Sequence, residues 1–180
     1  MLTLKPRLAV LLLAAILSPS AQSQNHGPYG LGRTATPAEI AGWNIDIDSK
    51  GSNLPSGSGS VNKGHEIYDQ QCAVCHGAKG EGGAADKLVG GQGTLATDNP
   101  VKTVGSYWPY ATTLFDYIRR AMPHTAPQSL SNEDVYAVSA YIPHLNGLLP
   151  ADGRLDAHSL VAILMPNRGN FIGDPRPDVK

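Results

Sequence analysis

The stretch QQCAVCHGAKG, residues 70–80, holds both cysteines of this 180-residue chain. Two residues separate Cys72 from Cys75, and His76 follows the second cysteine directly. Two thiols at this spacing with an adjacent imidazole fit only a few kinds of site, because each kind requires different further ligands or neighbours. The rest of the sequence distinguishes between them.

A zinc site and a redox-active dithiol each lack parts that they require. Structural zinc usually takes four ligands from two such pairs, and the chain has no third cysteine. A thioredoxin-like dithiol follows a strand in an α/β fold, and no strand pattern precedes Cys72. A disulfide between the two thiols stays open as an alternative for an exported chain.

Covalent haem attachment requires only what the stretch contains. Two thiols at this spacing form thioether bonds to the two vinyl groups of one porphyrin, and the histidine that follows binds the iron. We therefore predict that Cys72 and Cys75 carry one haem c and that His76 is an axial ligand of its iron.

The start of the chain predicts export. Lys5 and Arg7 precede an apolar run over residues 8–17, which is about half the length that a transmembrane helix requires. Small residues then fit a cleavage site near Ser23, so residues 1–23 are predicted to be a secretory signal peptide. We expect a periplasmic chain with no membrane span after cleavage, which agrees with haem attachment outside the cytoplasm.

Composition limits the remaining functions. The chain has 14 Lys and Arg against 15 Asp and Glu, a net charge of −1, and no basic run, so we expect no binding to nucleic acid. Its 20 Gly and 14 Pro indicate long loops. We expect an extended N-terminal arm and linker over residues 24–59, a haem-binding domain over residues 60–147 and a C-terminal tail over residues 148–180.

Apolar spacing predicts three main helices and no sheet, an all-α fold. The first begins after Ser60 as N-cap, the second covers residues 111–122, and the third begins after Ser131 as N-cap. Pro143 predicts that the third helix ends or kinks at Ile142. A short additional helix is predicted from Thr36, with Pro37 at its first position, and the chain has no internal repeat.

The second axial ligand is predicted to be Met122. It follows the second helix directly, and Pro123 extends the chain where a ligand loop is expected to turn. Thioether ligation is common in haem proteins, whereas a methionine near a helix end is otherwise usually a core residue. Met165 and His124 remain open as alternatives. Tyr107, Trp108 and Tyr110 are interpreted either as core residues or as hydrogen-bond donors to a haem propionate.

The order and spacing of CAVCH, AMP and SLSNEDVYAVSAYI resemble those of class I c-type cytochromes over residues 60–145. The flanking stretches GRTATPAEIAGWNIDID, GSGSVNKG, TVGSYWPYATTLFDYIRRAMP and MPNRGNFIGDPRPDV show a more specific resemblance. They are similar to the cytochrome subunits that accompany the molybdenum-cofactor subunit of bacterial sulfite dehydrogenases, and to the related haem domain of the sulfur dehydrogenase complex. Pro143 departs from this pattern and leaves only the last helical turn in doubt.

This resemblance implies a fold, a site and partners. The fold is that of class I cytochrome c, with three main helices around one covalent haem, an extended arm and a tail. The thioether cysteines are Cys72 and Cys75, and the axial pair is His76 and Met122. The resemblance also implies that the chain is the electron-accepting subunit of a molybdenum-dependent sulfite dehydrogenase, not its catalyst, and that it passes single electrons to a downstream cytochrome c or oxidase.

Several rival functions stay open at this point. One alternative is a free-standing electron carrier, and another is the cytochrome subunit of a thiosulfate, alcohol or aldehyde dehydrogenase. A haem enzyme or gas sensor requires a vacant sixth position on the iron, and a disulfide-stapled interaction module requires no haem at all. No cluster of acids, bases or nucleophiles is evident in the sequence.

Overall fold

The computed structural model describes residues 33–176, and the predicted signal peptide over residues 1–23 lies outside them. Contacts divide the described residues into two units, with the division between residues 41 and 42. Within residues 33–176 no helix has both the length and the apolar character needed to cross a membrane.

The first described helix is α2 (Pro37–Trp43), which begins with Pro37 as predicted. Its first turn is closed by reciprocal hydrogen bonds, because the Glu39 backbone N–H donates to Thr36 Oγ1 (3.3 Å) and the Thr36 backbone N–H donates to Glu39 Oε2 (2.8 Å). Arg33 Nη1 donates to the same carboxylate at 2.8 Å. Ion pairing with Arg33, then hydrogen bonds from Thr36, lower the pKa of Glu39 to about 2.

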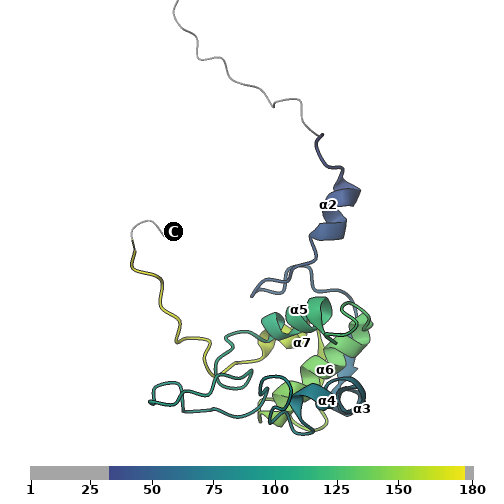
Figure 1. Cartoon of the computed structure of the whole chain (residues 1–180). Helices are drawn as coiled ribbons and strands as arrows, with labels where there is room; N and C mark the ends of the chain where they lie inside the picture. Colours follow the sequence, from purple (N-terminus) through teal and green to yellow (C-terminus); the bar gives the residue numbers. More distant parts are fainter. Residues whose placement is uncertain (1–32, 177–180) are drawn as a thin grey trace, which may run out of the picture. The chain divides into compact units, whose positions relative to one another are not determined.

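The remaining elements build the second unit (Figure 1). They are β1 (Ser58–Ser60), α3 (Val61–Gln71), α4 (Ala73–His76), α5 (Ala111–Ala121), α6 (Asn132–Leu145), β2 (Arg154–Asp156) and α7 (Ala157–Ala162). The three predicted main helices correspond to α3, α5 and α6, and the fold is mostly helical, but the prediction of an all-α fold with no sheet is wrong. The antiparallel pair of β1 and β2 was not predicted, because the sequence SGS in β1 carries no apolar alternation.

Helix α6 is the centre of this unit and contacts α3, α5 and both strands (Figure 1). The sequence predicted one buried side, marked by Val135, Val138 and Ile142, and these residues are buried. The burial extends further, since every residue from Val135 to Pro143 is buried. A helix covered on all sides loses the amphipathic pattern from which a single buried side is read.

Helix α3 begins as predicted, with Ser60 Oγ accepting a hydrogen bond from the Lys63 backbone N–H at 3.3 Å. It crosses α6 at very close range. A Cβ atom added to Gly64 would lie 1.9 Å from the carbonyl oxygen of Ala137, so only glycine fits at this crossing.

The sequence predicted that the third helix ends or kinks at Ile142, and an end at Ile142 is wrong. The helix continues through Pro143 to Leu145, and the Asn146 backbone N–H donates to the carbonyl oxygens of Ile142 and Pro143. Proline removes a single donor, and at this position its neighbours still form the last turn.

Residues beyond α6 complete the core. Leu155 in β2 is 1% exposed, Leu160 in α7 is fully buried, and Met165 is 3% exposed. Strand β2 follows α6 and pairs with β1, the strand that precedes α3. The segment after β2 packs against the same core as the three main helices.

Candidate functional site

The two cysteines lie at the junction of α3 and α4. Cys72 ends α3 and precedes α4, Cys75 lies within α4, and His76 is its last residue. Gly77 ends this short helix with a φ of 81°, a backbone conformation that favours glycine. Both thiols are free; Cys72 is half-buried and Cys75 is exposed.

The environment of Cys72 does not favour thiolate chemistry. Burial, and secondarily the neighbouring Cys75, raise the pKa of the Cys72 thiol to about 11. A redox-active or nucleophilic cysteine depends on a lowered pKa, because the thiolate is the reacting species. The raised pKa of the Cys72 thiol therefore does not favour the dithiol alternative.

The imidazole of His76 has a defined orientation. Its Nδ1 lies 2.8 Å from the carbonyl oxygen of Asp86, and a carbonyl oxygen only accepts, so Nδ1 carries the proton. Nε2 then holds the lone pair, and it forms no hydrogen bond with another residue among 33–176. This is the arrangement of a histidine prepared to bind a metal through Nε2.

The loop after α4 folds back on the thiol segment. The Gly82 backbone N–H donates to the carbonyl oxygen of His76 (2.8 Å), and that of Ala85 donates to Cys75 (2.9 Å). Tyr68, which is fully buried in α3, donates from its hydroxyl to the Gly77 carbonyl oxygen at 2.9 Å. These bonds place Asp86 beside His76.

Met122 caps the C-terminal end of α5. It is half-buried, its backbone is extended, and it packs at the edge of the core. Of the two alternatives, Met165 is 3% exposed inside the core and His124 is exposed. The partly buried residues at the edge of the same core include Cys72, Leu88, Trp108, Met122 and Leu130.

The aromatic segment between residues 107 and 110 is held by the C-terminal tail. Asn167 Nδ2 donates to the Tyr107 carbonyl oxygen at 2.7 Å, and the ring of Phe171 meets that of Tyr107 edge-on at 5.6 Å. The Trp108 ring packs edge-on against Tyr117 at 5.9 Å, so Trp108 and Tyr107 both have packing roles.

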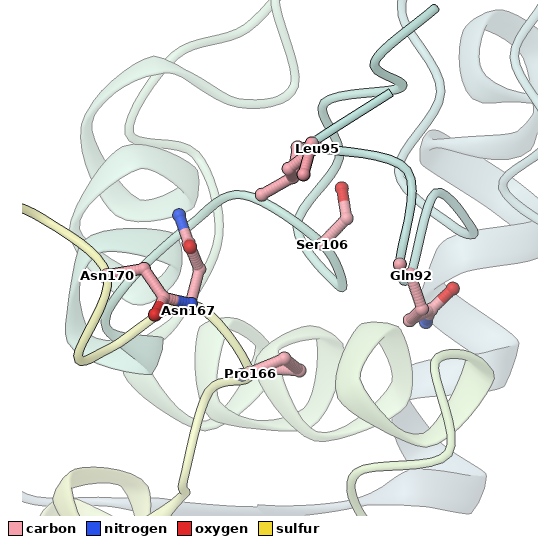
Figure 2. A pocket seen from close by; sticks show the side chains of 8 residues that line it. Gln92, Leu95, Ser106, Pro166, Asn167 and Asn170 are labelled. Atoms are coloured by element: carbon pink, nitrogen blue, oxygen red, sulfur yellow. The ribbon is translucent and has the colours of Figure 1, made fainter. Parts of the chain in front are cut away.

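A cavity of about 220 Å³ lies beside this segment (Figure 2). Its polar lining combines Gln92 and Ser106 with Asn167 and Asn170 of the tail, and Leu95 and Pro166 add apolar surface. None of the cysteines, His76 or Met122 lines it.

Sequence reasoning did not identify the Asp86 carbonyl oxygen, which accepts from His76 Nδ1, or the side chain of Asn146, which bonds Leu88 and Gly90. A backbone carbonyl leaves no signal in residue type. Asn146 lies beyond the predicted helix end, where the sequence predicted no site residue.

Comparisons with known proteins agree with this architecture. The family model described as cytochrome C oxidase, cbb3-type, subunit III matches residues 59–142. The crystal structure of the sulfane dehydrogenase SoxCD from Paracoccus pantotrophus superposes with a TM-score of 0.77 at 40% identity, over 84% of this chain and 75% of that one.

Two curated relatives are each named thiosulfate dehydrogenase. The protein from Stutzerimonas stutzeri is 34% identical over 93 residues, which are 49% of this chain and 28% of that protein. The protein from Psychrobacter arcticus is 29% identical over 101 residues, 51% of this chain and 31% of that protein. The chain thus spans less than a third of either relative.

Proposed function

The chain belongs to the c-type cytochromes, whose cofactor is covalently bound haem c, and from this premise we propose that it is the electron-accepting subunit of a periplasmic, molybdenum-dependent sulfite dehydrogenase. The observation that supports this proposal most strongly is the His76 imidazole, which is fixed through Nδ1 and free at Nε2, directly after two unpaired thiols.

The residues present fit a covalent haem. Cys72 and Cys75 would form the thioether bonds, and His76 and Met122 would be the axial ligands. Cys72 and Met122 lie far apart in the sequence, yet both are partly buried against one apolar core. When bound, haem iron supplies a centre that stores one electron at a time by changing between ferric and ferrous states.

The chain's own residues favour electron transfer over substrate chemistry. The Asp86 carbonyl holds the proton of His76 Nδ1 and keeps the imidazole in one orientation. Met122, in the sixth position, would leave no vacancy for oxygen or substrate. Buried Phe115, Ile118 and Val138 exclude water from the core. A dry and rigid surrounding would rearrange little when the haem iron gains or loses an electron.

Sulfite is the substrate that we propose for the partner, on the resemblance of the flanking sequences. Thiosulfate is the second candidate, because two curated relatives carry that name, although they match over only half of this chain. Electrons would pass from the partner's molybdenum to this subunit and then to a downstream cytochrome c or oxidase.

Exposed apolar residues on the arm and tail support a role in binding the molybdenum subunit. Ile40 and Trp43 of α2 are 53% and 87% exposed, and Phe171 and Ile172 of the tail are 51% and 94% exposed. Single exposed apolar side chains are ordinary, and the exposed pair on each of these segments is the reason that we propose this role for each. Deleting residues 24–43 should weaken co-purification with that subunit and leave the haem spectrum intact; unchanged association would reject this role.

The decisive experiment is purification of the complex from the native host, followed by addition of sulfite or thiosulfate in separate samples. We expect a molybdenum-containing partner and rapid reduction of the haem by sulfite. Reduction by thiosulfate alone would select the second candidate. A haem protein that purifies alone and is reduced by neither compound would instead identify a free-standing carrier.

A further inference from the structure

The side-chain amide of Asn146 forms four hydrogen bonds at the C-terminal end of α6. Oδ1 accepts from the Gly90 backbone N–H (3.1 Å) and from Gln92 Nε2 (3.3 Å). Nδ2 donates to the carbonyl oxygens of Leu88 (3.1 Å) and Ile142 (3.0 Å). Both donors and both lone pairs are therefore used, and the backbone partners determine which atom is oxygen and which is nitrogen.

This amide occupies a closely fitted position. Asn146 is 9% exposed, and a Cβ atom added to Gly105 would lie 1.9 Å from Asn146 Oδ1. From the other side, Thr103 Oγ1 donates to the Gly90 carbonyl oxygen at 2.6 Å. Gly90 itself has a φ of 93°, so this backbone conformation favours glycine. A surface amide that caps a helix end requires none of these restraints.

Three of the four partners lie in residues 88–92, the segment that directly follows the loop bearing Asp86. The two ends of this loop are joined by the backbone N–H groups of Leu88 and Val89, which donate to the Gly80 carbonyl oxygen at 2.9 and 3.1 Å. Asp86 thus lies within a loop whose end is fastened to α6 through Asn146. Its carbonyl oxygen in turn accepts the proton of His76 Nδ1.

We propose that Asn146 is a positioning residue for the haem iron: it anchors residues 88–92 to α6, keeps the Asp86 carbonyl oxygen within reach of His76 Nδ1, and so sets the orientation and basicity of the axial imidazole. Outer partners of a metal-binding histidine tune the metal in this way. The inference rests on the proposed role of His76 as a ligand.

Two substitutions separate the parts of this anchor. Asn146→Leu removes all four hydrogen bonds. Asn146→Asp keeps an acceptor for the Gly90 N–H and removes both donors, while its size is nearly unchanged. Asn167→Leu is the matched control, because Asn167 is 6% exposed and donates to a backbone carbonyl, but forms no hydrogen bond with residues 80–92.

The test uses the full holoprotein, matured in a host that attaches haem. In the ferrous state, NMR measures exchange of the His76 Nδ1 proton with solvent; a redox titration gives the reduction potential, and denaturation gives the free energy of unfolding. We expect Asn146→Leu to accelerate this proton exchange about tenfold or more and to shift the potential, with both axial bonds retained. Asn146→Asp should accelerate the exchange less. Asn167→Leu should lose stability, with the exchange rate and the reduction potential unchanged.

Equal exchange rates and potentials in Asn146→Leu and Asn167→Leu, compared at matched stability, would overturn the proposal and leave Asn146 a structural residue. If Asn146→Leu does not fold or acquire haem, Asn146→Asp takes its place. Its exchange rate and reduction potential are then compared with those of Asn167→Asp. A native protein without histidine ligation would refute the proposed function itself, and this result is visible in its spectrum before any variant is made.

Discussion

The Nδ1 atom of His76 donates a hydrogen bond of 2.8 Å to the backbone carbonyl oxygen of Asp86, ten residues further along the chain. This bond fixes the tautomer and leaves the Nε2 lone pair available to bind a metal. In the proposed haem site, Cys72, Cys75 and His76 would bind from one segment of the chain, and the thioether of Met122 would bind from another. The first prediction concerns Met122.

Met122→Leu should abolish the weak long-wavelength absorption band that iron–thioether bonding gives to the oxidised protein, and should lower the reduction potential. Met165→Leu is the control: Met165 is 3% exposed in the core, and a swap of similar volume should cost less than about 1.5 kcal/mol and leave the band unchanged. Loss of the band in Met165→Leu and its retention in Met122→Leu would exchange the two assignments.

Gly64→Ala should destabilise the fold by roughly 1–3 kcal/mol or more, because the added methyl group would meet the carbonyl oxygen of Ala137 at 1.9 Å. Gly42→Ala is the matched helical control, since an added Cβ there has no atom within 4 Å. Denaturant unfolding followed by circular dichroism measures both. Equal stability of the two variants would mean that α3 and α6 do not cross as closely as described.

Asp116→Ala should release the segment that precedes α3. The buried Asp116 carboxylate accepts from the Ile47 backbone N–H at 3.2 Å and pairs with Arg120. Removing it leaves the Ile47 N–H without its partner, a loss of about 1–3 kcal/mol, and should accelerate hydrogen exchange at that amide. Asp174→Ala removes an exposed ion pair with Arg176 and should change neither stability nor hydrogen exchange. Similar effects from both variants would mean that Asp116 does not hold the segment around Ile47.

The first turn of α2 should weaken only in strong acid. The pKa of Glu39 is lowered from 4.5 to about 2, so its contribution is complete above pH 4.5 and is lost as the pH falls toward 2. An NMR titration of the Glu39 carboxyl carbon and of the Thr36 amide should give this low midpoint. Glu39→Gln should remove the pH dependence of the Thr36 amide. A midpoint near 4.5 would mean that the pairing with Arg33 is absent in solution.

Local sequence signals predicted much of this fold because they act over a few residues. Ser60 and Ser131 mark the starts of α3 and α6 through side-chain caps, and the spacing of Cys72, Cys75 and His76 predicts the haem attachment. Features that depend on distant contacts were missed. Leu155 and Met165 enter the core only after the chain has returned to β1, and no periodicity in the tail reveals it.

The candidate site likewise combines residues that local sequence signals identify with residues that only the folded structure reveals. Residue types identify thiols, an imidazole and thioethers, so these candidates could be found in the sequence. The Asp86 carbonyl and the Asn146 amide act through the folded loop between them, and each is visible only when residues 80–92 and the end of α6 are brought together. The prediction that the helix ends at Ile142 failed for a related reason, because the tendency of Pro143 to end a helix is outweighed by the packing of a buried helix.

Mass spectrometry of the exported protein tests the central claim most directly. After purification from a host that matures c-type cytochromes, the peptide spanning residues 70–80 should carry the mass of one haem, bound through both Cys72 and Cys75. The same peptide with two free thiols, or with a disulfide between them, would contradict covalent haem attachment and with it the electron-transfer function.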